Sequence, residues 1–430
     1  MPKSLKISLL VVSVALALFV FAGGLGLHGV HAATAQSDGA YRPIMVYSEV
    51  LKRIQSDYVV DPNIPQVTTG ALRGLVESLD ADSSYLTAED YAFYKAHVND
   101  AKAQIGLTMS KRFGYATVVS VLPGSPADKA DITDGDIIEA IADQSTRVMP
   151  LALINMRLAG APGTSVTFAV VRPRKAAPDT VTLTRTVPVM PPVAEQQYEG
   201  SSILYLKPET LDHERVQQIE SKLKAMPKNG NKKILLDLRD VSTGDMPDAV
   251  RLANFFLSSG TIATLEGQNV PKQVFAAEAG KALNTTAPLV VLVNHGTYGP
   301  AEVVAAAVMD DKRGDLVGDR TFGEGAQQKV IDLPDGAALI LSIAKYETPS
   351  GKVLQDDAVM PNVQVASNFA DDSAPDDDAT GSPMSPTSPT GPKIVPKAAP
   401  KPVVIKTAPP AAKTDDQLNK ALELLKAKAA

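Results

Sequence analysis

The amino-acid sequence predicts a modular α/β protein with α+β character, and three observations lead to this fold class. Continuous apolar runs typical of buried strands alternate with amphipathic helical stretches in the second half of the chain. Short β-rich runs separated by glycine and proline fill residues 104–173. Apolar residues at steps of three and four predict helices near both ends. With 430 residues, the chain is long enough for two or three domains.

The alternating segments of the second half define the expected core. The predicted strands are residues 203–206, 233–238 and 289–293. The predicted helices are residues 214–226, 246–257 and 301–309. This alternation predicts a sheet covered by helices.

Charge and cysteine content exclude several classes of function. The formal net charge of -6 at pH 7 gives no broad basic face, so we expect no nucleic-acid binding. The chain has no cysteine, which excludes disulfides, thiolate nucleophiles and zinc–thiolate sites. His97 and His213 lack the spacing of a metal-binding pair, and we expect no metal and no cofactor.

The first 35 residues have the pattern of an export signal. Two lysines precede an uninterrupted apolar run over residues 7–22, and small residues follow up to Ala35. Cleavage sites ending at Ala32 and Ala35 suit a signal peptide, whereas the apolar stretch would also serve as a retained membrane anchor. We expect residues 1–35 to be a signal peptide or signal anchor, and the protein to be periplasmic or otherwise extracytoplasmic, either secreted or anchored.

Residues 41–98 are expected to form a helical N-terminal lead-in. Apolar residues recur at helical spacing over residues 43–58 and 65–79. The Asp61-Pro62-Asn63 turn joins these two helices.

The C-terminal part of the chain changes composition twice. Residues 366–413 are rich in Asp, Ser, Pro and Ala, and we expect a disordered linker because they bury too little apolar surface. Thr414 begins a pattern typical of a capping box, and an apolar stripe predicts a helix over residues 414–430. We expect this helix to dock on its own chain or on a second protomer.

The β-rich module resembles a PDZ domain through the order of its turns. These turns are Leu122-Pro123-Gly124-Ser125-Pro126-Ala127, Asp134-Gly135-Asp136 and Ala161-Pro162-Gly163-Thr164. The resemblance implies a peptide-binding domain, expected over residues 99–186, that adds an extended peptide to a sheet edge and holds its C-terminal carboxylate. It places the accepting strand and carboxylate loop at Ile105, Gly106, Leu107 and Thr108. Asp131 stands where the family usually has glycine, so we expect the local turn to differ.

Further motifs resemble the carboxy-terminal processing proteases, the S41 serine peptidases. They are Leu79-Asp80 with Ser83-Ser84-Tyr85-Leu86, Leu236-Asp237-Leu238-Arg239-Asp240, Asn294 to Glu302, Thr321 to Gln328, Tyr346 to Lys352, Pro361-Asn362-Val363 and Gln417-Leu418. The resemblance covers about residues 44–365 and the C-terminus, and implies an S41-type, ClpP- and crotonase-like α/β core at residues 187–365. Exported members of this family trim or degrade proteins with unstructured, apolar C-terminal tails, using a Ser/Lys dyad.

In register with the family, other residues occupy both dyad positions. The family loop Asn-x-Gly-Ser-Ala-Ser-Ala-Ser-Glu, whose middle serine is the nucleophile, matches at Asn294 and Glu302 but has Gly299 at the nucleophile position. In the family loop Thr-Phe-Gly-Lys-Gly the lysine is the general base, and Glu324 stands there. The glutamine that orients this lysine is kept as Gln328.

The resemblance also locates the oxyanion donors. One is the backbone N–H of the residue after the nucleophile, here Pro300, which has none. The other comes from a glycine-rich turn, in which Gly244 is the glycine that remains. Glycine offers no attacking atom, and no amine base is present, so we expect no covalent catalysis.

Three functions follow from these residues. The first is a pseudoprotease that binds peptide or protein C-terminal tails, as an adaptor or as a regulator of an active protease. The second is an active serine-type endopeptidase with rearranged residues, for which Thr297 and His295 are the pair to consider. We expect Thr297 instead to cap the following helix and His295 to be an exposed loop residue. The third is another reaction on a crotonase-like core, disfavoured because Pro300 removes an oxyanion donor.

Overall fold

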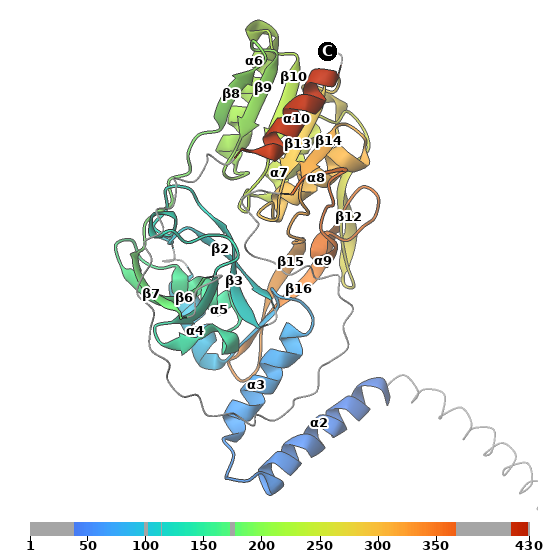
Figure 1. Ribbon diagram of the computed structural model, residues 1–430. Helices are drawn as coiled ribbons and strands as arrows, with labels where there is room; N and C mark the ends of the chain where they lie inside the picture. The colour runs from blue at the N-terminus through green and yellow to red at the C-terminus, as the bar shows by residue number, and fades with distance from the viewer. Residues whose placement is uncertain (1–37, 99–101, 113, 173–176, 367–413, 429–430) are drawn as a thin grey trace, which may run out of the picture. The chain divides into compact units, whose positions relative to one another are not determined.

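The structure, a computed structural model, describes residues 38–98, 102–112, 114–172, 177–366 and 414–428 (Figure 1). The expected signal segment and the expected linker from residue 367 onward lie outside these ranges. The chain divides into two compact units, Met1–Ala71 and Leu72–Ala430. Within the described residues, no helix has the length and apolarity needed to span a membrane.

Two helices were predicted in the lead-in, and both are present. They are α2 (Asp38–Asp57) and α3 (Ile64–Glu77). The lead-in also contains the short strand β1 (Ser84–Leu86) and the helix α4 (Ala88–His97), which the apolar spacing did not predict. Thr87 caps α4 by accepting a hydrogen bond from the N–H of Asp90.

The β-rich module forms one antiparallel sheet in the order β2-β3-β4-β6-β7, with the short β5 beside β4. Its elements are β2 (Leu107–Arg112), β3 (Tyr115–Val121), β4 (Ile137–Ile141), β5 (Gln144–Ser145), α5 (Leu151–Leu158), β6 (Ser165–Val171) and β7 (Asp179–Thr184). Fully buried Ile138, Ile154 and Phe168 join α5 to the sheet in one core.

The structure places the segment from Ile105 to Thr108 as a loop followed by a strand. The strand begins only at Leu107, because Gly106 has a φ of +89° and interrupts the extended backbone. Asp131 takes the left-handed conformation, with φ 52° and ψ 38°, which glycine adopts without steric cost.

The C-terminal core is a six-stranded sheet in the order β17-β14-β13-β10-β9-β8. Its strands are β8 (Ala194–Tyr198), β9 (Ile203–Lys207), β10 (Lys233–Asp237), β13 (Leu289–Val293), β14 (Asp315–Gly318) and β17 (Val363–Gln364). All neighbours are parallel except the edge pair β8 and β9. The apolar runs predicted from sequence are therefore strands that are buried on both faces.

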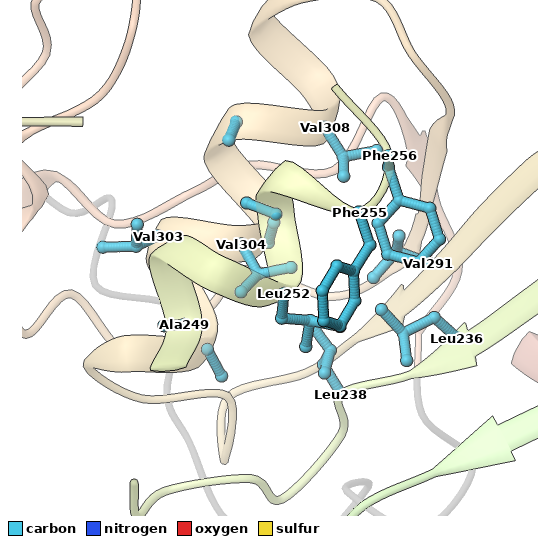
Figure 2. Close-up of a cluster of buried hydrophobic side chains, with 14 of the residues drawn as sticks. Leu236, Leu238, Ala249, Leu252, Phe255, Phe256, Val291, Val303, Val304 and Val308 are labelled. Carbon is cyan, nitrogen blue, oxygen red and sulfur yellow. The ribbon is translucent and has the colours of Figure 1, made fainter. Parts of the chain in front are cut away.

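One face of this sheet is covered by α6 (His213–Asn229), α7 (Met246–Asn254) and α8 (Pro300–Asp310). Figure 2 shows Leu236 and Val291 of the sheet close to Phe256 and to Val304 and Val308 of α8. These residues are almost fully buried, so this layer holds the strand ends and the α8 N-terminus in fixed positions.

The opposite face of the sheet is covered by the last helix, α10 (Asp416–Ala427), drawn in red in Figure 1. Ala421 and Leu425 pack on Leu235 and Leu292 of the sheet, so the helix docks on its own chain. The expected capping box is wrong in detail: Asp415, not Thr414, is the N-cap and accepts from the N–H of Leu418 (2.9 Å).

A third sheet, which was not predicted, combines one strand of the lead-in with four strands from the C-terminal part of the chain. It consists of β1, β11 (Thr261–Gly267), β12 (Val270–Ala276), β15 (Ala326–Asp332) and β16 (Ala338–Glu347). Tyr85 of β1 pairs with Leu339 of β16, which brings residues 82–84 of the lead-in to the core. The short helix α9 (Leu354–Asp357) follows β16.

Candidate peptide groove and protease-like cleft

The turn between β13 and α8 determines the position of residue 299. Pro300 is the first residue of α8, where a missing N–H costs nothing. Gly299 precedes it with φ +57° and ψ -113°, a conformation that favours glycine. A sharp, strained strand-to-helix turn is the local structure that presents a nucleophile in other hydrolases, and here it presents no side chain.

Glu302 joins this turn to the loop that carries Glu324. Its two carboxylate oxygens accept from the N–H groups of Gly299 (2.9 Å), Gly323 (2.8 Å) and Glu324 (2.8 Å), and from the hydroxyl of Thr321. Burial raises the pKa of Glu302 to about 7, although the hydrogen bonds favour the ionised form. Because the N–H groups of residues 299 and 324 share one carboxylate oxygen, these two positions are adjacent in space.

The residues considered as a rearranged catalytic pair have other roles. Thr297 is fully buried. Its hydroxyl group donates a hydrogen bond to the carbonyl of Leu238 (2.9 Å) and accepts one from the N–H of Asn294 (3.0 Å). It therefore ties the loop to the end of β10, and the expectation that it caps α8 was wrong. His295 is exposed, as expected, and its ring lies 5.2 Å from the ring of Phe322.

A cavity of about 500 Å³ brings together all five positions that the sequence assigned to catalysis. They are Gly244, Gly299, Pro300, Glu324 and Gln328. Gln328 donates through its side-chain amide to the backbone carbonyl of Asp82 (2.8 Å). We name this cavity the cleft.

Asp82 also lines the cleft, and the sequence did not reveal its place there. Its carboxyl group shares a hydrogen bond with Glu324, and it accepts a further one from the amide of Gln355 (3.4 Å). Burial raises the pKa of Glu324, and the neighbouring Asp82 carboxyl raises it further. The position that the sequence assigned to the base thus carries a carboxyl group that is paired with a second one and favours its protonated form.

Backbone donors around the nucleophile position are already engaged. The N–H of Gly299 donates to Glu302, that of Ala301 to the carbonyl of Tyr298 (3.3 Å), and that of Glu302 to the carbonyl of Gly299 (3.0 Å). Pro300 has no N–H. The N–H groups of Gly299, Ala301 and Glu302 are therefore all hydrogen bonded within the protein.

A second cavity, of about 610 Å³, lies along β2 and α5. We name it the groove. Of the four residues assigned to peptide binding, Ile105, Leu107 and Thr108 line it. Ile105 is 1% exposed and belongs to the PDZ core, so it supports the loop from beneath. Gly106 lines a smaller neighbouring cavity, and its carbonyl accepts from the N–H of Leu122 (2.9 Å).

The groove and the cleft are continuous. Both are lined by Met109, Asn155, Tyr298 and Gln328. The groove along β2 therefore adjoins the cleft that contains Gly299.

Ser242, in the loop after β10, connects the PDZ module to the core. Its hydroxyl is hydrogen bonded to Thr108 of β2 (2.7 Å) and to Ser120 of β3. The sequence placed this loop at the oxyanion turn but gave no sign of its contact with the PDZ sheet, because the two segments are more than a hundred residues apart.

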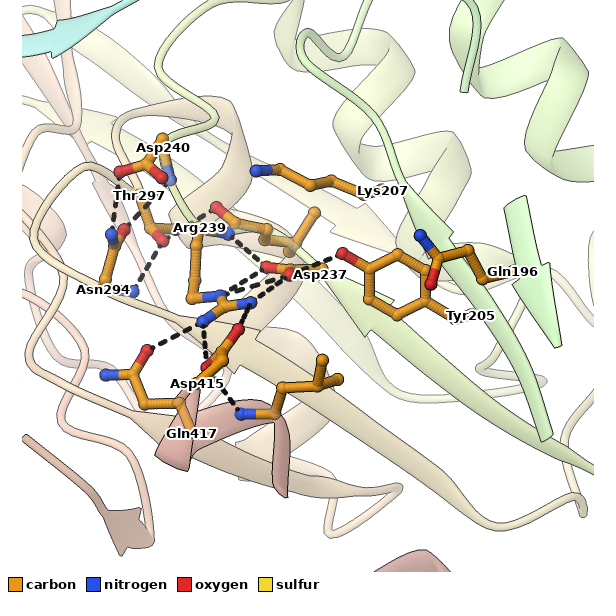
Figure 3. Close-up of polar contacts among 12 residues, drawn as sticks. Gln196, Tyr205, Lys207, Asp237, Arg239, Asp240, Asn294, Thr297, Asp415 and Gln417 are labelled. Carbon is orange, nitrogen blue, oxygen red and sulfur yellow. Dashed lines mark hydrogen bonds and ion pairs between the residues drawn. The ribbon is translucent and has the colours of Figure 1, made fainter. Parts of the chain in front are cut away.

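The same loop is tied to α10 through Arg239, as Figure 3 shows. The guanidinium group donates to Asp237 at the end of β10 and makes two hydrogen bonds with Asp415 (2.9 Å each). Asp237 is fully buried and also accepts from the hydroxyl of Tyr205 (2.9 Å). The Leu-Asp-Leu-Arg motif thus has a structural role in holding α10.

Among the described residues, no group of three or more His, Cys, Asp or Glu side chains is arranged to hold a metal ion.

Comparison with known proteins gives the class that this fold and cleft define. The model of peptidase family S41 matches residues 202–365, and the PDZ domain model matches residues 117–172. A solved structure of a photosystem II D1 C-terminal processing protease matches with a TM-score of 0.61 at 24% identity, covering 75% of this chain and 92% of that protein.

Sequence relatives specify the family further. A carboxyl-terminal-processing protease of Picosynechococcus sp. is 32% identical over 288 residues, which are 66% of this chain and 69% of the relative. The carboxyl-terminal-processing peptidase 2 of Arabidopsis thaliana, a chloroplastic protein, is 29% identical over 330 residues, 72% of this chain and 62% of the relative. The chain therefore belongs to peptidase family S41, among the carboxyl-terminal-processing proteases. The predicted family and fold class are confirmed.

Proposed function

We propose that this protein is a pseudoprotease of the carboxyl-terminal-processing family, which binds unstructured C-terminal peptide tails without cutting them. The observation that carries the proposal is the composition of the cleft. Gly299 supplies no attacking atom, Pro300 supplies no N–H, and Glu324, which is hydrogen bonded to the carboxyl group of Asp82, stands where the family has an amine base.

The persistence of the surrounding framework supports retained binding. Glu302 keeps four hydrogen bonds to the two loops of the cleft although neither loop carries its catalytic residue. The groove stays open along β2 and leads into the cleft. A tail whose C-terminus is held at Gly106–Thr108 would extend from the PDZ module towards residue 299.

The proposal includes export by the N-terminal segment and the domain limits given from sequence. Lys3 and Lys6 ahead of the apolar run support export, because that arrangement is typical of signal sequences. An exported tail-binding protein would act as an adaptor, or as a regulator of an active protease that meets the same tails.

The test compares three proteins on unstructured, apolar-tailed substrates. They are the natural chain, a restored variant with Gly299→Ser, Pro300→Ala and Glu324→Lys, and a matched variant with Gly299→Ala, Pro300→Ala and Glu324→Lys. The matched variant has the same lysine and the same strained residue 299 but no hydroxyl. We expect all three to bind tails and the restored variant alone to cleave them.

Two results would refute the proposal. One is cleavage by the natural chain that disappears on Glu324→Gln or Thr297→Val, which would indicate rearranged catalysis. The other is failure of the natural chain to bind a tail with a free C-terminal carboxylate any better than the same peptide as a C-terminal amide.

A further inference from the structure

The cleft carries a charge pattern that tail binding alone does not explain. Among the described residues that line it, the side chains with an ionisable carboxyl are Asp82 and Glu324, and none is Lys, Arg or His. Glu302 lies directly behind, fully buried, with its oxygens turned to the backbone of both loops. Where the family resemblance places a lysine, this chain presents acid.

Tyr298 lies where the groove meets the cleft and is close to the same carboxyl groups. It lines both cavities. Burial raises the pKa of Tyr298 well above its ordinary value, and the carboxyl groups of Glu324, Asp82 and Glu302 each raise it further. A peptide that passes from the groove into the cleft therefore passes Tyr298 and reaches the carboxyl groups of Asp82 and Glu324, which line the cleft with it.

The cleft leaves room for a ligand side chain beside Glu324. A Cβ atom at residue 299 would meet no atom within 4 Å, so the space of the missing nucleophile is open. Residues 299 and 324 are adjacent, because both donate to the same oxygen of Glu302. At about 500 Å³, the cleft is in the size range of side-chain and small-ligand sites.

We propose that the cleft binds a basic side chain, lysine or arginine, of the peptide whose C-terminus occupies the groove, and that Glu324 with Asp82 selects it. This inference rests on the proposed tail binding. A cation placed beside the pair releases the shared proton to solvent and gains charge-assisted hydrogen bonds to the two carboxylates. A neutral side chain gains no such bonds, and an acidic one is repelled. The protein thus recognises a tail with an apolar C-terminus and a basic residue upstream of it.

The experiment measures binding of short fluorescent peptides to the full chain by anisotropy. Each peptide has the same apolar tail, and one lysine is moved through the upstream positions. Acetyl-lysine at the same position keeps the length of the side chain and removes its charge. We expect one or two adjacent positions at which lysine binds about tenfold more tightly than acetyl-lysine, equivalent to about 1.4 kcal/mol.

Glu324→Gln and Asp82→Asn test the assignment to the pair. Glu278→Gln is the matched control, because it removes one carboxylate from an exposed residue that lines neither cavity. We expect the lysine preference to fall below about twofold in both cleft variants and to stay unchanged in the control. Circular dichroism of each variant checks that it is folded, and two independent cleft variants keep the test decisive if one is not.

The outcomes separate this inference from the proposed function. If tails bind but no position prefers lysine, or if the preference survives both cleft substitutions, the basic-residue site is refuted and tail binding stands. If no tail binds, both are refuted. Loss of the preference in the cleft variants, with neutral tails still bound, supports both.

Discussion

Replacing Gly106 with alanine should unfold the carboxylate loop of the PDZ module. A Cβ at residue 106 would lie 2.2 Å from the Cβ of Ser125, whereas carbon atoms in contact are normally about 3.5–4.0 Å apart. Ser125 cannot easily retreat, because it is 7% exposed and its N–H donates to the carbonyl of Leu122 (3.1 Å). Overpacking of this kind costs about 1–3 kcal/mol, and the φ of +89° adds about 1 kcal/mol for alanine. We therefore expect the free energy of unfolding of the PDZ module to fall by about 3 kcal/mol in total.

The assay for this variant is native-state hydrogen exchange of β2 and β3 in the full chain, read by mass spectrometry. Gly163→Ala is the matched control: its φ is +80°, but an added Cβ meets nothing within 4 Å, so it should lose only about 1 kcal/mol. The difference of about 2 kcal/mol corresponds to about thirtyfold faster opening in Gly106→Ala than in the control. Equal exchange in the two variants would refute the steric argument. So would an undiminished difference when Ser125 is also replaced by glycine.

Three further predictions concern the core and its contacts. Through Glu302, the free energy of unfolding should fall by about 3 kcal/mol between pH 4.5 and 8. Its folded pKa of about 7 lies above the ordinary value for glutamate, so its contribution to stability is complete below that ordinary pKa and is lost as the pH rises through 7. The difference in unfolding free energy between the natural chain and Glu302→Gln, measured in urea, should change with pH in this way, and a difference that does not depend on pH would contradict the prediction. Asp415→Asn should weaken the docking of α10 by about 1–2 kcal/mol and speed amide exchange in α10, because it removes a charge from the contact with Arg239. Glu423→Gln, which removes an exposed ion pair with Lys420, should leave exchange in α10 unchanged. Equal effects of the two substitutions would argue against the Arg239 contact. Ser242→Ala should lower the stability of the PDZ module by about 1–2 kcal/mol, because the hydroxyls of Thr108 and Ser120 lose their shared partner. Amide exchange in β2 measures this loss. Thr182→Ala, which removes the exposed hydrogen bond to Thr167, should cost less than about 0.5 kcal/mol, and a larger loss in Thr182→Ala than in Ser242→Ala would refute the prediction.

The sequence predicted three of the buried strands of the six-stranded sheet within one residue. These strands, β9, β10 and β13, are mostly apolar runs of strand length. The strands β12 and β15 were not predicted, because most of their residues are exposed and mix polar with apolar side chains without alternation. Their stability comes from pairing with β11 and β16, which local sequence does not encode.

The candidate site divides in the same way. The positions of Gly299 and Glu324 came from motifs in register with a family, and the fold places both on one cavity. The backbone carbonyl of Asp82 accepts a hydrogen bond from the side-chain amide of Gln328. The two residues are 246 positions apart in the sequence, and no spacing rule connects them. The aspartate stands next to the Ser83-Ser84-Tyr85-Leu86 motif, which was the one local signal that this segment matters. The partner of Ser242 was equally hidden, because hydroxyl pairs leave no pattern in a sequence.

The position of α10 has a consequence for how the chain is made. The strands of the central sheet are complete by residue 364, but Ala421 and Leu425, which cover one of its faces, come more than fifty residues later. If the sheet folds as the chain is made, its apolar face stays uncovered until residue 425 has emerged. At about 5–20 residues per second, this interval lasts several seconds. A sheet that forms before α10 is available leaves Tyr205, Leu235 and Leu292 open to solvent and to other chains, so we expect misassembly at this one defined surface.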